Sequence, residues 1–149
     1  MSGKGLGKAV SELIMEELLN VLKNDSVLSD YVREFRISEP MSITELPLIY
    51  VQLSASRGEE FIRRGQRTFE RLVHVDICVV DRHVEPREAD LRALRLAEQV
   101  CQVVIANPTL NGFAEGCSIE AIVPEYGALR DHALARVRVA VAFKVMWHA

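Results

Sequence analysis

The sequence predicts an α+β domain in which a mixed, largely antiparallel sheet of four or five strands carries two main helices on one face. Apolar residues recur at helical spacing in two long segments, 8–23 and 86–106. In shorter segments they alternate with polar residues, as half-buried strands do. The order is helix, two or three strands, helix, two strands, and this order favours the α+β class.

Composition is that of a globular domain. The chain has 149 residues, of which 49% are hydrophobic and 26% are charged, and its formal net charge is −3. These values exclude fibrous and low-complexity proteins and a surface built throughout for nucleic acid. We expect one domain over 8–149, preceded by a flexible glycine-rich start over 1–7. No signal peptide or apolar membrane span is predicted, and three widely spaced cysteines suit a reducing cytoplasm.

The first third of the chain is expected to be mainly helical. In 8–23, apolar side chains recur every three or four positions and leave the other face polar. A short helical turn over 27–32 and a weakly patterned strand over 32–37 follow. Pro40 and Pro47 then bracket a loop, because each lacks a backbone donor.

The middle of the chain combines two strands, a charged segment and a helix. Residues 48–54 are rich in β-formers and predict a strand. Residues 56–68 hold four arginines and few apolar side chains, and predict a long exposed loop. Alternation over 69–80 predicts a second strand. Pro86 is well placed as the first residue of a helix that runs to Ala106.

The last segment contains the most regular pattern in the chain. A strand over 117–123 and a turn region over 124–132 precede 135–147, where apolar and other residues alternate without a break. At about 3.3 Å per residue this closing strand is roughly 43 Å long. It is longer than the core of so small a domain requires, so we expect it to bend, to project, or to pair beyond its own subunit.

The arginines of the charged loop are candidate binding residues. Arginine side chains bind phosphate well, and the loop contains Arg57, Arg63, Arg64 and Arg67. Few aromatic residues lie near them to stack on bases, however, and neighbouring glutamates reduce the positive charge. A solvated or protein-contacting loop is favoured. Lysine accounts for only four of the eighteen basic residues, and arginine is the residue enriched at protein interfaces.

A metal site is a weaker hypothesis. His74, Asp76 and Cys78 share one face of a predicted strand, about 6.8 Å apart. The same face is expected to carry Arg136 and Arg138, so an ordinary polar sheet face is favoured. No nucleotide-binding or acyl-transfer motif is present, and the paired carboxylates Glu16-Glu17 and Glu59-Glu60 are expected to be solvated charge. We predict no catalytic, cofactor-binding or metal-binding residue.

Several segments together resemble a known family. They are Pro-Leu-Ile-Tyr-Val-Gln-Leu at 47–53, Val-His-Val-Asp-Ile-Cys-Val-Val at 73–80, the helix from Pro86 and the long closing strand. In order and spacing they resemble the tail terminator or tail completion proteins of long-tailed bacteriophages, over most of 8–147. The resemblance rests on element order and not on a diagnostic motif.

This resemblance implies a structural virion protein without catalysis or cofactor. Its copies would form a hexameric ring that caps the tail tube, ends tube polymerisation and offers a surface for head–tail joining. Its partners would be other copies, the tail tube protein and head connector or neck proteins, with DNA at most passing through the ring lumen. It would be assembled in the host cytoplasm and reside in the virion tail, with no membrane partner.

Interface residues are inferred from the chain itself, since the family offers no motif to transfer. We expect subunit contacts at sheet edges and at the charged loop. The candidates are Arg57, Arg63, Arg64, Arg67, Arg136, Arg138 and Trp147. Three alternatives stay open: a head-to-tail adaptor or other neck protein, a small α+β ligand-binding module with a concave polar pocket, and a metal-dependent enzyme using His74, Asp76 and Cys78.

Overall fold

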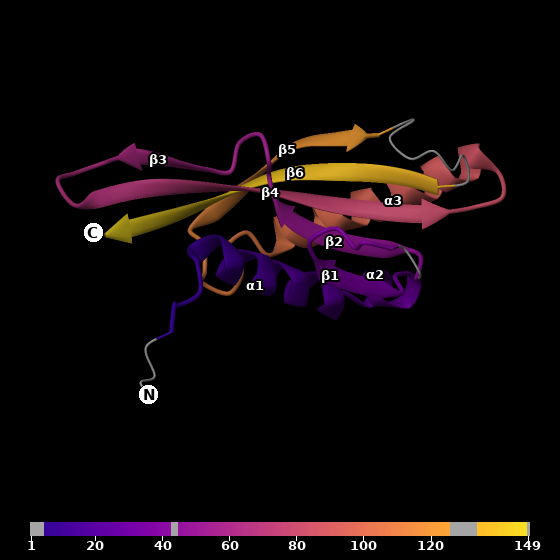
Figure 1. Cartoon of the computed structure of the whole chain (residues 1–149), viewed down its shortest axis with the longest axis horizontal. Helices are drawn as coiled ribbons and strands as arrows, with labels where there is room; N and C mark the ends of the chain where they lie inside the picture. The colour runs from indigo at the N-terminus through magenta and orange to yellow at the C-terminus, as the bar shows by residue number, and fades with distance from the viewer. Residues whose placement is uncertain (1–4, 43–44, 126–133, 149) are drawn as a thin grey trace.

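The fold was obtained as a computed structural model, which describes residues 5–42, 45–125 and 134–148. In this part of the chain three helices and six strands follow one another (Figure 1). The helices are α1 (Val10–Asn24), α2 (Ser26–Tyr31) and α3 (Pro86–Ala106). The strands are β1 (Glu34–Ile37), β2 (Leu48–Leu53), β3 (Glu59–Arg63), β4 (Thr68–Arg82), β5 (Gly116–Pro124) and β6 (Leu134–His148).

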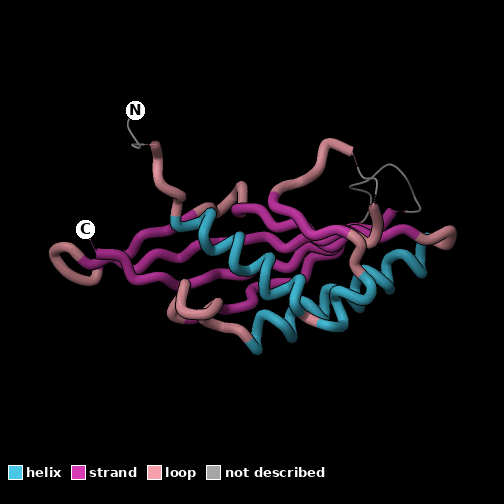
Figure 2. The backbone as a smooth tube through the Cα atoms, turned by 90° about the horizontal axis from the view of Figure 1, so that it is seen from below, coloured by secondary structure: helices cyan, strands magenta, loops and turns pink. Residues whose placement is uncertain are grey.

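All six strands belong to one sheet with the order β1-β2-β4-β6-β5, and β3 pairs with β4 next to β2. Only β1 and β2 run parallel; the other pairs are antiparallel. The helices gather on one face of this sheet, as Figure 2 shows. The predicted α+β class is therefore confirmed, with α1 and α3 as the two main helices.

The core lies between the helices and this face of the sheet. Val75 pairs with Val141 and Ile77 with Val139, and all four side chains are buried. The helices cover these side chains with apolar stripes at helical spacing. The stripes consist of Ile14, Leu18 and Leu22 on α1 and of Ala89, Ala93, Ala97, Val100 and Val104 on α3. The predicted periodicities therefore identify both surfaces of the core.

The prediction of a long exposed loop over 56–68 is wrong. Residues 59–63 form β3, which pairs with β4 from Glu59 opposite Val73 to Arg63 opposite Phe69. Most of β3 is exposed, so the hydrophobic effect imposes no apolar alternation on its sequence. Its partner strand, not its composition, specifies it, and the sheet has six strands instead of the four or five expected.

The closing strand projects, one of the three outcomes expected from its length. β4 and β6 each have 15 residues and pair along their whole length, from Thr68 opposite His148 to Arg82 opposite Leu134. The pairing of β5 with β6 begins only at Gly116 opposite Lys144. Beyond that point β3, the start of β4 and the end of β6 extend past the helices as a ribbon (Figures 1 and 2). We call residues 59–72 and 145–148 the arm.

Some sequence-based expectations fall wholly or partly outside the described residues. These are residues 1–4 of the flexible start, residues 43–44 of the loop between Pro40 and Pro47, and residues 126–132 of the turn region. Among the helices of the described chain, none has the length and apolar character to cross a lipid bilayer.

Replacing Val141 by aspartate is expected to prevent folding. Val141 is fully buried between β4 and β5, and an unpaired carboxylate there would cost on the order of 4 kcal/mol, much of the stability of a small domain. Circular dichroism and thermal unfolding measure this. Ser118→Asp, at an exposed position of β5, is the control and should retain the wild-type spectrum. A cooperatively folded Val141→Asp variant would contradict the assigned core.

Candidate assembly surface

The arm carries an aromatic cluster on the part of the sheet that extends past the helices. Phe69 and Trp147 are register partners on β4 and β6, and Phe61 lies beside them on β3. The ring centroids of Phe61 and Trp147 are 6.1 Å apart, and those of Phe69 and Trp147 are 5.9 Å apart. The Arg71 guanidinium lies over both Phe61 and Trp147, 4.8 Å and 5.6 Å from the ring centroids.

This cluster is exposed despite its packing. Phe61 is 51% exposed and Trp147 is 40% exposed. Phe69, Arg71 and Val73 occupy every second position of β4 and therefore share one face, so the cluster continues the face that the helices cover further along the sheet. The arm therefore carries an unpartnered extension of the core face, with Trp147, a predicted interface residue, within it.

The predicted loop arginines separate into different environments. Arg63 donates from Nε to Gly65 O and from Nη2 to Gln66 O, which closes the hairpin turn between β3 and β4. Arg64 pairs with Glu70, at 2.9 Å. Arg67 is exposed on the turn. Arg57 lies at the other end of β3 and belongs to a different cluster.

That second cluster ties the base of the arm to the sheet. His74 Nε2 lies 2.6 Å from Glu60 Oε1 on β3, and His74 Nδ1 lies 3.1 Å from Glu120 Oε1 on β5. Arg57 bridges the same two glutamates, at 3.1 Å from Glu60 and 2.6 Å from Glu120. We call these four residues the clamp. An ionised carboxylate can only accept hydrogen bonds. Each of the two contacts of the His74 ring is therefore a hydrogen bond only when the ring nitrogen that makes it carries a proton.

The clamp stabilises its carboxylates in the ionised form. The hydrogen bond from Arg57, followed by that from His74, lowers the pKa of Glu60. Burial disfavours the charged form of Glu120, but hydrogen bonds from Arg57 and His74 outweigh burial, and its pKa is also lowered.

A β-bulge explains how Glu120 reaches His74 across an intervening strand. Ile119 pairs with Val141 and Ala121 with Ala140, so Glu120 is an extra residue in β5. Bulges redirect side chains in this way. The β6 residues on the same face are Ala140 and Ala142, and their small side chains leave space above β6.

Two predicted arginines neutralise the rest of this face. Arg136 pairs with Glu125 and donates to Tyr50 Oη at 3.1 Å. Arg138 pairs with Glu125 at 3.1 Å and lies 3.6 Å from Asp76. Burial raises the pKa of Asp76, and the charge of Arg138 only partly offsets that effect. Both arginines therefore have intrachain partners, although each remains partly exposed.

The residues of the metal hypothesis do not converge. His74 faces two carboxylates and Asp76 faces Arg138, whereas Cys78 packs with Leu48, Tyr50 and Val80 in a small apolar cluster. Burial raises the pKa of the Cys78 thiol to about 12. Across the described residues, no three His, Cys, Asp or Glu side chains are arranged to hold a metal ion.

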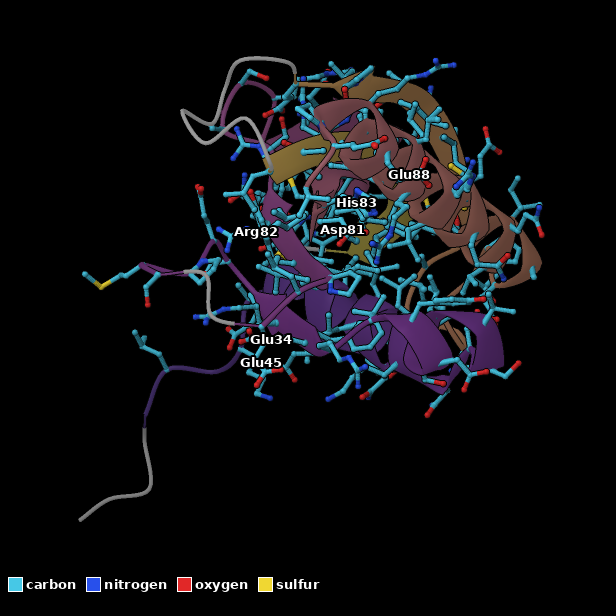
Figure 3. All side chains as sticks on the ribbon, turned by 90° about the vertical axis from the view of Figure 1, so that its right-hand side faces the viewer. Glu34, Glu45, Asp81, Arg82, His83 and Glu88 are labelled. Carbon is cyan, nitrogen blue, oxygen red and sulfur yellow. The ribbon has the colours of Figure 1, made fainter. Side chains whose placement is uncertain are left out.

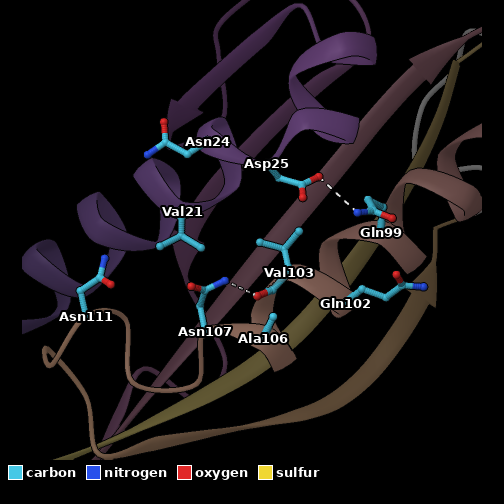
Figure 4. Close-up of a pocket in the computed structure, with 9 residues that line it drawn as sticks. All are labelled: Val21, Asn24, Asp25, Gln99, Gln102, Val103, Ala106, Asn107 and Asn111. Atoms are coloured by element: carbon cyan, nitrogen blue, oxygen red, sulfur yellow. Dashed lines mark hydrogen bonds between the residues drawn. The ribbon is translucent and has the colours of Figure 1, made fainter.

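A polar groove of about 490 Å³ runs between the ends of α1 and α3 (Figure 4). Asp25 accepts from the backbone of Leu28 at the start of α2 and from Gln99 Nε2 at 3.2 Å. Asn107 Nδ2 donates to Val103 O at the end of α3. Much of the polar lining thus serves helix ends and helix–helix contacts instead of converging on a ligand.

Sequence reasoning missed the carboxylates Glu60, Glu120 and Glu125. His74 is 14 residues from Glu60 and 46 residues from Glu120, and Arg138 is 13 residues from Glu125. The bulge that directs Glu120 towards His74 leaves no residue signature. Part of the aromatic cluster could have been predicted from the sequence. Aligning the two long alternating segments as antiparallel strands places Phe69 opposite Trp147, as in the structure. The signal was their similar length, since the alternation covers 69–80 in one segment and 135–147 in the other.

The fold and the arm define a class of domain, an open and mainly antiparallel sheet with helices on one face and a β-ribbon extending past them. No family model and no curated protein matches the sequence. Among solved structures, the chain is similar to one from the virion of native gene transfer agent (GTA) particle. The TM-score is 0.68 at 15% identity, over 94% of this chain and 99% of that chain. At this identity the likeness shows a shared fold.

Enlarging Ala142 is expected to disrupt the clamp. Ala142 is the Cα partner of His74 and is 6% exposed, so leucine there would crowd the imidazole and cost about 1–3 kcal/mol in the free energy of unfolding. Denaturant unfolding measures this. Ala140→Leu is the matched control, because Ala140 borders a cavity of about 380 Å³ and should cost less. Equal effects of the two variants would contradict the proposed crowding.

Alkaline pH is expected to destabilise the protein through Cys78. The thiol pKa rises from 9.0 to about 12 on folding, so the unfolded chain loses its proton first. The free energy of unfolding should then fall as pH rises above 9, with a slope of up to about 1.4 kcal/mol per pH unit. Denaturant titrations at pH 8, 9 and 10 measure this slope. Cys78→Ala should reduce this slope, and part of it should remain because burial also raises the pKa of the Cys101 and Cys117 thiols. An unchanged slope would contradict the assignment.

Proposed function

We propose that this chain is a structural protein of a phage-like virion, and specifically a tail terminator whose copies form a ring on the end of the tail tube. The observation that carries the proposal is the end-to-end likeness of its fold to a chain of a gene transfer agent virion. That likeness covers nearly the whole of both chains, so it concerns the complete domain and not one shared motif.

The arm supports an assembly role. An aromatic cluster with exposed Phe61 and Trp147 is costly to leave in water, and patches of this kind mark protein contacts. The chemically capable side chains of the sheet are used differently. His74 contacts Glu60 and Glu120, Asp76 lies near Arg138, and Arg136 pairs with Glu125. These contacts within the chain suit a rigid building block better than a catalytic centre.

On this proposal the role is non-catalytic and needs no cofactor. The ring, taken as hexameric from the family resemblance, would end tube polymerisation and offer its other side to the head connector. The tail tube protein and neck proteins would be its partners, with DNA only passing through the lumen. A head-to-tail adaptor is the second candidate, because the likeness is to a chain of a virion and supports other structural components of such a particle equally.

Oligomeric mass and tube binding test the proposal. Multi-angle light scattering should give a multiple of the chain mass, and negative-stain images should show rings. Pre-formed tail tubes of the same particle should bind these rings at one end and stop elongating. Rings that bind connectors but leave tube growth unaffected would favour the adaptor. A protein that stays monomeric both alone and with tubes would overturn the proposal.

Reversing the charge of Arg67 is expected to weaken assembly without affecting the fold. Arg63 and Arg64 hold the hairpin turn and Glu70, whereas Arg67 is exposed at the tip of the arm. Arg67→Glu should leave the melting temperature unchanged and weaken each contact about fivefold, or ~1 kcal/mol. Sedimentation velocity measures assembly.

Lys23→Glu, on the last turn of α1, is the matched charge reversal away from the arm. It should assemble as the wild type does. Unimpaired assembly of Arg67→Glu would show that the hairpin tip is not at an interface.

A further inference from the structure

Exposed apolar side chains gather at both ends of the molecule. At one end is the arm, with Phe61 and Trp147. At the other end, α2 and α3 enclose a groove of about 320 Å³, in which Val27 and Tyr31 are 43% and 63% exposed. We call this the end groove; its lining includes Val27, Tyr31, Pro47, Asp81, Arg92 and Leu96. Figure 1 shows the arm and α2 at opposite ends of the elongated sheet.

We infer that the arm of one copy docks in the end groove of a second copy, a contact that rests on the proposed ring. A closed ring requires a heterologous interface, in which two different surfaces of the same chain meet. The described part of the chain offers an apolar surface of this kind at each end, in the arm and in the end groove. A contact between two identical ends would give a two-fold symmetric dimer, and assembly would not continue beyond two copies.

The chemistry of the two surfaces is complementary. Leu96 and Pro47 provide an apolar floor for an aromatic ring. Arg92 and Arg95 line the same groove, held by Asp81 at 3.1 Å and by Glu88 at 3.2 Å. Guanidinium groups fixed in this way attract the faces of aromatic side chains.

Charges around the groove fit the tip of the arm. Residues 61–69 hold three arginines and no acidic residue. Figure 3 looks onto the opposite end and labels Glu34, Glu45, Asp81 and Glu88 there, together with Arg82 and His83. Asp81 and Glu88 are already engaged by Arg92 and Arg95. Glu45 is exposed two residues before Pro47, so it can pair with an arginine of an arm tip that reaches past the groove.

Complementation between two defective chains tests this contact. Trp147→Ala damages the arm but leaves the groove, and Tyr31→Ala damages the groove but leaves the arm. Each variant alone should lose rings, with assembly weakened about 30-fold at each contact, because buried aromatic anchors dominate interfaces. An equimolar mixture has one intact pair of surfaces and should give a heterodimer that cannot close.

Controls separate folding from docking. Ile105→Ala removes a side chain that is 66% exposed on α3 and does not line the end groove, so it should keep rings intact. Thermal unfolding must show both test variants folded. Should Trp147→Ala fail to fold, Phe61→Ala takes its place, since Phe61 is more exposed.

Each outcome decides a different question. Heterodimers that form in the mixture, and not with either variant by itself, support the inference. If Tyr31→Ala alone forms dimers, the arms contact each other and the inference is wrong. If both variants form normal rings, the ring exists but uses other surfaces, and the proposed function survives. If wild-type chains form no ring with or without tubes, the proposed function itself fails.

Discussion

The full-length pairing of β4 with β6 is the constraint on which the rest of the structure depends. Fifteen residues of each strand hold one register, which places the apolar residues 73, 75, 77 and 79 of β4 and 137, 139 and 141 of β6 on the helix side. The same register places His74, Asp76, Arg136 and Arg138 on the other side. A slip of one residue would exchange the two sets and bury charge under the helices. Core, charged face and arm are therefore consequences of one ladder.

Charge on the open face is managed by pairing across strands. The clamp links β3, β4 and β5, and Glu125 links the two arginines of β6. These pairs are partly exposed and each contributes little by itself. Together they compensate charge on a face that none of the three described helices covers. The exposed apolar surface of the arm lies on the opposite face, the one that the helices cover further along the sheet.

Periodicity was enough to predict most of the fold, because burial on one side imposes it. Helices 8–23 and 86–106, and the long segment 135–147, are examples, and Pro86 marks the start of α3. β3 could not be found in this way, since its sides face water and only its neighbour specifies it. The clamp was also out of reach: Glu120 depends on a bulge, and bulges are a property of two strands and not of one sequence. Trp147, predicted as an interface residue, lies in the exposed aromatic cluster of the arm, and its neighbour Phe61 was not among the predicted residues.

The geometry of the long ladder also has a mechanical consequence. The arm is continuous with the two central strands, so a pull along its axis is transmitted straight into the middle of the sheet. Antiparallel hydrogen bonds lie perpendicular to the strands, and such a load strains many of them in shear at once instead of peeling them one by one. The domain is thus built to bear tension along the arm, and to yield more readily to a force that lifts β3 sideways from its five paired residues.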